Sequence, residues 1–258
     1  MGQLYVNERD IVVPGQLLAD GMDYLPSSGA YRENERIIST LLGLVNLEGR
    51  LIKIIPLRGR YMPKIGDIVI GRVVEMTFSN WFVDIGCTNN GVLSLSEVEE
   101  YVEKGTDLST YYDFGDYIVA RISNVMRNNI DLSMRGPGLR KLTPGRLLTI
   151  NSSKVPRLIG KQGSMISLLK MKTGCKILVG QNGVIWVQGH PQNEMLVQET
   201  IKLVDERAHT EGLTEYITSF LDEEVKKRNL EVLPPAPEDE GRHTETSEHG
   251  DQGEYREY

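Results

Sequence analysis

Long apolar runs, cysteines and closely spaced histidines are all scarce in this sequence of 258 residues. No apolar run approaches the roughly 20 residues of a membrane-spanning helix, and the N-terminus lacks the charged-then-apolar pattern of a signal peptide. Cys87 and Cys175 lie far apart without CxxC spacing, which is typical of reduced thiols in a cytosolic protein. The histidines show no metal-ligand spacing. We therefore expect a cytoplasmic protein with no membrane segment, no metal and no cofactor.

The residue sets that carry catalysis are also missing. The sequence shows no carboxylate cluster for magnesium, no Ser, His and Asp set for nucleophilic attack, and no Walker-type glycine loop. Asp107, Asp113 and Asp116 lie too near loops and strand starts to suggest a metal trio. These absences favour a chain that binds its partner and does not catalyse a reaction.

Acidic residues are absent from one long stretch. Between Asp131 and Glu194 there is no Asp or Glu, but there are ten basic residues: Arg135, Arg140, Lys141, Arg146, Lys154, Arg157, Lys161, Lys170, Lys172 and Lys176. The same stretch contains a Gly-x-x-Gly sequence from Gly160 to Gly163, flanked by apolar residues. Lysines neutralise phosphates, and glycines let the backbone approach phosphates closely. This pattern predicts that the chain binds RNA.

The net charge of −7 is concentrated in residues 231–258. This segment holds nine acidic and two basic residues, so it carries the whole net charge and residues 1–230 balance to zero. A proline-rich entry and few aliphatic residues predict a disordered acidic tail. The tail either only solvates the protein or shields its basic face from non-specific RNA, and the former interpretation is favoured.

Residues 1–60 are predicted to form a small β domain. Ile11–Val13 is an apolar run that ends at a Pro-Gly turn, and residues 37–45 and 51–56 have the composition of strands. Residues 46–49 suit a turn between the last two. Nothing in this region resembles a catalytic site, so docking to another protein is its expected role.

Residues 61–135 are predicted to form a five-stranded closed barrel. Five strand-like segments with turn signals between them begin near residues 66, 81, 92, 115 and 128. The phrases GDIVIGRVV, WFVDIG, GVLSLSE, FGDYIVARI and IDLS occur in the order typical of the S1 domain, and the segment closely resembles that OB-fold RNA-binding module.

The S1 resemblance implies a set of RNA-binding side chains. It places Phe82 at the aromatic position of the binding face, with Trp81 beside it, and bases stack well on aromatic rings. Arg72, Arg121 and Arg127 could supply a positive rim, or be solvated arginines. Many S1 domains have a basic residue or His where this chain has Ser94, which weakens the case for direct RNA binding. Packing of Trp81 into a neighbouring domain is an equally weighted alternative.

Residues 142–230 show the element order strand, helix, helix, strand, strand, helix. Ser164 is placed to cap a helix that stops at Thr173-Gly174, Asn182-Gly183 signals a hairpin, and Pro191 starts a long amphipathic helix. A further amphipathic helix over 213–230 is expected to pack on this domain. With Ile159 to Ile166 matching the I-G-x-x-G-x-x-I phrase, the segment resembles a KH domain of the eukaryotic type, type I.

In KH domains the Gly-x-x-Gly loop clamps about four nucleotides of single-stranded nucleic acid. The resemblance implies that Gly160 and Gly163 permit close backbone approach, while Lys161 contacts phosphate and Gln162 donates hydrogen bonds. Lys154 and Arg157 are expected to flank the same edge. A KH fold that serves only as a structural wedge is the alternative.

The order of β domain, S1, single KH and acidic tail resembles the archaeal exosome RNA-binding cap subunits of the S1-plus-KH type over residues 1 to about 230. This resemblance implies a non-catalytic, trimeric cap, with or without a sister S1-type subunit, on a ring of three RNase-PH-like heterodimers. The N-terminal domain would dock to the ring, and the cap would recruit single-stranded RNA with a poly(A) preference. A transcription elongation or antitermination factor is the alternative, although such factors usually have two KH modules. A nuclease would require a catalytic domain, which residues 1–60 are too short to form.

Overall fold

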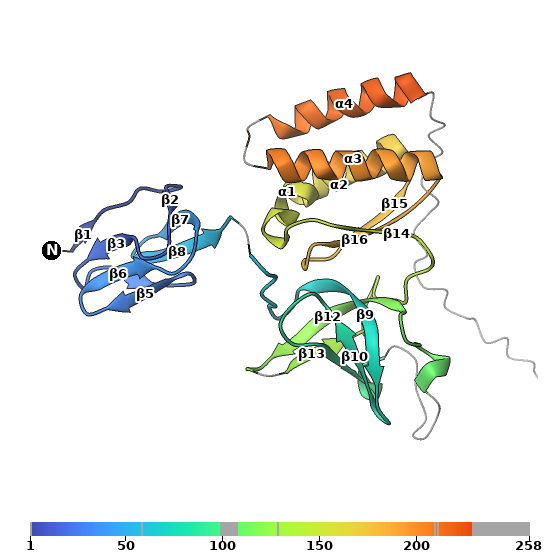
Figure 1. The fold of residues 1–258 in the computed structure, drawn as a ribbon, viewed down its shortest axis with the longest axis horizontal. Helices are drawn as coiled ribbons and strands as arrows, with labels where there is room; N and C mark the ends of the chain where they lie inside the picture. The colour runs from blue at the N-terminus through green and yellow to red at the C-terminus, as the bar shows by residue number, and fades with distance from the viewer. Residues whose placement is uncertain are drawn as a thin grey trace, which may run out of the picture.

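The computed structural model describes residues 2–57, 59–98, 108–127, 129–208, 210 and 212–228. The predicted acidic tail, 231–258, lies outside these residues. The chain is a mixture of β and α+β structure, with an N-terminal β region, a closed barrel and a helical region (Figure 1). No helix among the described residues is long and apolar enough to cross a membrane.

The N-terminal region consists of two four-stranded sheets around one small apolar core. The first sheet has the order β1-β3-β6-β5, with β1 (Gln3–Leu4), β3 (Leu17–Asp20), β6 (Arg36–Ser39) and β5 (Ala30–Glu33). The second has the order β2-β7-β8-β4, with β2 (Ile11–Val12), β7 (Gly43–Glu48), β8 (Leu51–Pro56) and β4 (Leu25–Pro26).

Two expectations for this region were wrong in detail. Residues 37–45 form parts of two strands, β6 and β7, which belong to different sheets. The predicted turn at 46–49 is instead the end of β7, and the chain reverses at Gly49, which has φ 64°. The first error arises because an apolar run does not reveal where the chain passes from one sheet to the other.

The predicted barrel is confirmed as a closed five-stranded sheet with the order β10-β11-β13-β12-β9. Its strands are β9 (Ile68–Met76), β10 (Asn80–Asp84), β11 (Gly91–Ser94), β12 (Tyr117–Val125) and β13 (Ile130–Ser133). Alternate side chains along these strands point inward and fill the barrel. Closure leaves every strand paired on both sides and frees the outer surface for ligand contacts.

The predicted KH arrangement is confirmed as a three-stranded antiparallel sheet, order β14-β16-β15, covered by helices. The elements are β14 (Arg146–Thr149), α1 (Val155–Ile159), α2 (Ser164–Thr173), β15 (Lys176–Val179), β16 (Val184–Gln188), α3 (Pro191–Arg207) and α4 (Leu213–Arg228). Short 3-10 turns, η3 (Ser152–Lys154) and η4 (Lys161–Gly163), flank α1. Helix α2 ends at Gly174 as expected, but Ser164 begins the helix and its side chain does not cap it; Gly163 is the N-cap residue.

The two faces of the KH sheet pack against different partners. Leu147, Trp186 and Leu178 lie opposite one another across the three strands and belong to the apolar cluster of the barrel. Their neighbours on the other face, Ile185 and Val187, join the cluster that the helices cover. Because successive strand residues alternate between faces, one sheet joins the barrel to the helices and makes a continuous unit of the two domains (Figure 1).

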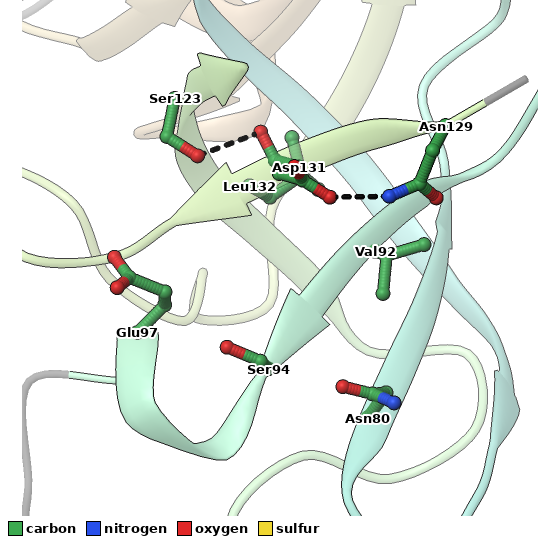
Figure 2. Close-up of a pocket in the computed structure, with 8 residues that line it drawn as sticks. All are labelled: Asn80, Val92, Ser94, Glu97, Ser123, Asn129, Asp131 and Leu132. Carbon is green, nitrogen blue, oxygen red and sulfur yellow. Dashed lines mark hydrogen bonds between the residues drawn. The ribbon is translucent and has the colours of Figure 1, made fainter. Parts of the chain in front are cut away.

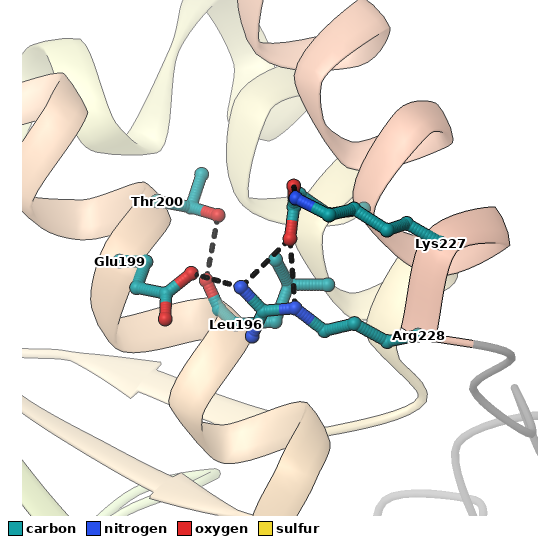
Figure 3. Close-up of polar contacts among 6 residues, drawn as sticks. Leu196, Glu199, Thr200, Lys227 and Arg228 are labelled. Atoms are coloured by element: carbon teal, nitrogen blue, oxygen red, sulfur yellow. Dashed lines mark hydrogen bonds and ion pairs between the residues drawn. The ribbon is translucent and has the colours of Figure 1, made fainter.

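Helix α4 packs on the KH helices, as predicted, through Leu213, Ile217 and Leu221. Arg228 near its end donates to Glu199 of α3 at 2.6 Å and to Glu224 of α4 at 2.7 Å (Figure 3). The hydrogen bond that Arg228 donates to Glu199 is the main reason that the pKa of Arg228 is raised. This network holds the two helices together at the surface.

The hairpin predicted at Asn182-Gly183 is confirmed, and its tip docks on the barrel. Asn182 Nδ2 donates to the carbonyls of Ile70 at 2.8 Å and Ile85 at 3.0 Å, and Asn182 Oδ1 accepts from Ile70 N–H at 3.3 Å. Gln181 N–H also donates to the Ile68 carbonyl at 2.8 Å. Strand β10 pairs with β9 only as far as Arg72, so the hairpin tip occupies the part of the β9 edge that β10 leaves open.

Candidate nucleic-acid interface

The Gly-x-x-Gly loop lies between α1 and α2 and presents its two central residues to solvent. Gly160 N–H donates to the Pro156 carbonyl at 3.0 Å, and Gly163 N–H donates to the Gly160 carbonyl at 3.3 Å. Lys161 and Gln162 are both exposed. Gln162 has the left-handed φ of 51°, which is uncommon for a residue with a side chain. Local backbone geometry therefore brings together the four loop residues that the sequence singled out.

Gly160 is required at its position by both conformation and space. Its φ of 77° and ψ of 176° fall in a region that is almost exclusive to glycine. A Cβ there would lie 2.8 Å from Met165 N and 2.9 Å from Ser164 Oγ. Gly163 also has a positive φ, 79°, but the nearest atom to an added Cβ is Ile166 Cγ2 at 3.9 Å. The first glycine is thus the more constrained of the two.

We expect Gly160→Ala to lower the free energy of unfolding by about 2 kcal/mol or more and to weaken RNA binding, because the added methyl displaces the start of α2. Gly163→Ala is expected to cost only about 1 kcal/mol, since only its positive φ is unfavourable. Urea denaturation and RNA titration of both variants check this order. Equal effects of the two substitutions would contradict the steric argument.

The two basic side chains expected to flank the loop, Arg157 and Lys154, differ in their contacts. Arg157 on α1 is exposed, near the loop in sequence. Lys154, in contrast, donates to the Asp205 carbonyl at 2.6 Å and forms an ion pair with the Asp205 carboxylate at 3.0 Å. Lys154 therefore carries a paired charge at this edge, because α3 brings an acid to it from 51 residues away.

Ion pairs also neutralise other basic residues of the acid-free stretch between Asp131 and Glu194. Among the described residues, folding brings acids from outside the stretch to several of its basic residues, in the pairs Lys141–Asp116, Arg146–Glu194, Lys154–Asp205 and Lys172–Asp222. The pKa of Asp116 is affected most by burial, which raises it, but hydrogen bonds from Lys141 and the Asp113 backbone lower it overall. The basic field is therefore smaller in space than in the sequence.

Phe82 lies on the outer face of the barrel, half-buried. In the strand register it is opposite Val92 of β11, and Val92 is opposite Asp131 of β13. These three side chains form one row across the barrel, because residues directly opposite one another in a sheet point to the same side. The expected position of Phe82 on an accessible face agrees with this row.

A shallow pocket adjoins the row (Figure 2). It is lined by Asn80, Val92, Ser94, Glu97, Ser123, Asn129, Asp131 and Leu132. Asp131 accepts hydrogen bonds from Asn124 Nδ2 at 3.2 Å and from Asn129 Nδ2. Among the described residues no basic side chain lines the pocket. The pocket suits the edge of a base better than a phosphate.

Trp81 was expected beside Phe82 on the binding face or against another domain, and both expectations are wrong. Its side chain is 0% exposed and lies in the barrel core. The indole N–H donates to the Tyr112 carbonyl at 3.1 Å, and the ring packs edge-on against the Tyr112 ring with centroids 5.2 Å apart. Adjacent residues of a strand point to opposite faces, so Trp81 and Phe82 cannot both face outward.

The three arginines expected to form a positive rim lie on different parts of the barrel. Arg72 is exposed on β9, Arg121 is half-buried on β12, and Arg127 is exposed after β12 ends. In the strand register Arg72 lies opposite Tyr117, whereas Arg121 lies opposite Ile68, four residues further along β12. The structure therefore distributes these charges and does not gather them around the pocket of Figure 2.

Phe78 is an exposed aromatic that the sequence reasoning missed. It follows β9 in the turn to β10 and is fully exposed, at 101%. An aromatic in a Thr-Phe-Ser-Asn turn between two strands was the available signal, because such a position cannot be buried by strand alternation. Phe78 is the most accessible stacking surface on the barrel.

The described part of the chain holds two free cysteine thiols and no cluster of metal ligands. Among these residues no group of three His, Cys, Asp or Glu side chains could hold a metal ion. The Cys87 thiol is half-buried, donates to the Asn89 carbonyl at 2.9 Å, and has a pKa raised chiefly by burial. The Cys175 thiol is buried, and burial likewise raises its pKa. A raised pKa disfavours the reactive thiolate.

Three family models match this chain in succession. Residues 9–58 match the N-terminal domain of the exosome RNA binding protein RRP4, residues 60–104 match the RRP4 S1 domain, and residues 145–193 match the KH domain. Each match falls within one of the three structural regions described above and covers part of it.

Curated relatives agree with these models. The exosome complex component Rrp4 of Methanothermobacter thermautotrophicus is 42% identical over 220 residues, which cover 85% of this chain and 70% of that protein. The Rrp4 of Thermococcus kodakarensis is 42% identical over 251 residues, covering 93% of this chain and 97% of that protein. A crystal structure described as an exosome complex RNA-binding protein superimposes with a TM-score of 0.59 at 35% identity, covering 66% of this chain and 99% of the other.

Proposed function

The chain belongs to the Rrp4 family of exosome components, and from this premise we propose that it is the non-catalytic RNA-binding subunit of an exosome. The observation that carries the proposal is the union of two RNA-binding folds, the barrel and the KH domain, in one packed unit. The KH loop exposes Lys161 and Gln162, and the barrel exposes Phe78 and half-exposes Phe82. Single-stranded RNA is the ligand that both surfaces suit.

The finer assembly is part of the proposal. Three copies would form a cap, alone or with a sister S1-type subunit, on a ring of three RNase-PH-like heterodimers in the cytoplasm. The outer face of the second N-terminal sheet supports docking by this domain, because Ile11, Leu44 and Ile55 form an apolar row across β2, β7 and β8. Ile11 is 65% exposed and Ile55 is 44% exposed. Three weak RNA sites held together would bind far more tightly than one.

A pull-down of the tagged full chain from native extract, with RNase treatment, tests the assembly. We expect mass spectrometry to identify two RNase-PH-like subunits. A truncation that begins near Arg60 is the matched control and should lose them, since it lacks the N-terminal sheets. Recovery of RNA polymerase in place of the ring subunits would instead support the transcription-factor alternative.

Phe78 provides a test of RNA contact by the barrel. We expect Phe78→Ala to weaken binding of a fluorescent oligo(A) by about 1–3 kcal/mol, the usual value of one base stacked on an aromatic. Stability should not change, because the side chain is fully exposed. Tyr31→Ala, which removes an exposed aromatic from the N-terminal domain, is the control. Unchanged affinity of Phe78→Ala would remove this residue from the RNA site.

A further inference from the structure

Three arginines lie on adjoining segments where the chain leaves the barrel for the KH domain. Arg121 of β12 is opposite Ser133, the last residue of β13. Arg135 follows Ser133 by two residues, and its N–H donates to Ser133 Oγ at 3.2 Å. The connector then returns along β12, where the Arg140 carbonyl accepts from Val119 N–H at 2.8 Å. The connector therefore brings Arg135 and Arg140 back to the part of β12 that carries Arg121.

The register of the connector places two of these side chains on one face. An antiparallel bridge joins Ile118 to Lys141, which sets Arg140 opposite Val119. Val119 and Arg121 are two residues apart on β12, so Arg140 and Arg121 point to the same side. The Arg121 side chain reaches the connector at Gly136, where a Cβ added to the glycine would be 3.4 Å from Arg121 Nη2. The Arg121 guanidinium therefore lies beside the connector at Gly136, the residue that follows Arg135.

The positive charge of this cluster is not neutralised within the described residues. No ion pair or hydrogen bond there joins the guanidinium groups of Arg121, Arg135 and Arg140 to a carboxylate. Of the described acids on adjoining segments, two have other partners. Asp116 pairs with Lys141, and Asp67 accepts a hydrogen bond from Tyr61 Oη at 2.6 Å. Glu97, whose carbonyl accepts from Met134 N–H, has its side chain in the pocket of Figure 2.

We propose that Arg121, Arg135 and Arg140 form a connector patch that binds the phosphates of single-stranded RNA between the two RNA-binding folds. Guanidinium groups suit phosphate because they donate two parallel hydrogen bonds. The apolar residues of the connector, Met134 and Leu139, are buried, so the patch offers charge without the apolar centre of a protein interface. This inference rests on the proposed RNA-binding function and adds a site to it.

The test replaces the three arginines with glutamine, R121Q/R135Q/R140Q, in the full chain. Binding of fluorescent oligo(A) is measured by anisotropy from 50 to 300 mM KCl. If each arginine neutralises one phosphate, the slope of log K against log salt should become shallower by about 2, and affinity at 0.1 M salt should fall roughly 100-fold. R135Q alone should make the slope shallower by about 0.7. Because Arg135 is exposed, this single variant should fold normally and tests the patch even if the triple variant misfolds.

The matched control is R9Q/R36Q/R50Q, which removes the same charge from exposed positions of the N-terminal domain and should bind as the wild type does. An unchanged slope in R121Q/R135Q/R140Q overturns the connector patch. If that variant binds RNA normally but loses the ring subunits in a pull-down, the patch faces an acidic protein surface and the proposal is wrong.

A K161D/Q162D variant in the same assay separates the connector patch from the proposed RNA-binding function. If K161D/Q162D loses affinity while R121Q/R135Q/R140Q does not, only the connector patch is contradicted. If the wild type itself does not bind oligo(A), the connector patch and the proposed RNA-binding function are both contradicted.

Discussion

Replacing both tip residues of the KH loop, Lys161→Asp with Gln162→Asp, is expected to weaken RNA binding by about 100-fold at 0.1 M salt. The loop backbone should be preserved, because both side chains are exposed and the positions that need glycine are unchanged. The substitution removes one positive charge and adds two negative charges where phosphates would approach. Anisotropy titration with oligo(A) measures the loss.

A control variant within the same domain is available for this experiment. Gln192→Asp with Lys202→Asp changes the same residue types by the same charge at exposed positions of α3. This control should bind RNA within about twofold of the wild type, since surface charges away from the ligand contribute little. If the loop variant also binds like the wild type, the KH domain is a structural wedge, and the RNA contacts must lie on the barrel and the connector.

Removing the Asn182 side chain is expected to destabilise the packed barrel and KH unit by about 3 kcal/mol. Asn182→Ala deletes three hydrogen bonds to the backbone of Ile70 and Ile85. The two Ile70 groups lie at the end of β9 that β10 does not cover, and the Ile85 carbonyl directly follows β10, so three buried groups lose these partners. Leaving buried polar groups unpaired is more costly than losing a hydrogen bond at the surface.

Urea denaturation followed by tryptophan fluorescence can measure this effect. The two tryptophans, Trp81 in the barrel and Trp186 in the KH sheet, belong to one apolar cluster and should report a single transition in the wild type. In Asn182→Ala we expect a lower midpoint, and separate transitions if the domains uncouple. Asn90→Ala, at an exposed position, should change stability by less than about 0.5 kcal/mol. A similarly small change in Asn182→Ala would show that apolar packing alone joins the domains.

The barrel and the KH element order could be predicted because their signals are local. Alternation of apolar residues, Gly-Asp strand openings, and the Asn182-Gly183 turn each depend on residues close together in the chain. The Gly-x-x-Gly loop is equally local, since its shape follows from the positive φ of its glycines. The order of these domains along the chain then carried the resemblance to exosome cap subunits.

Side-chain exposure and charge pairing required the tertiary structure. The pattern around Trp81 and Phe82 does not state which of two adjacent residues faces inward, and only barrel closure decides it. The acid-free stretch looked uniformly basic, but Asp205, Glu194, Asp222 and Asp116 reach it through folding. Asn182 was read as a turn residue, whereas it also bonds to Ile70, 112 residues away. Sequence patterns report local conformation, and these contacts arise only when distant segments meet.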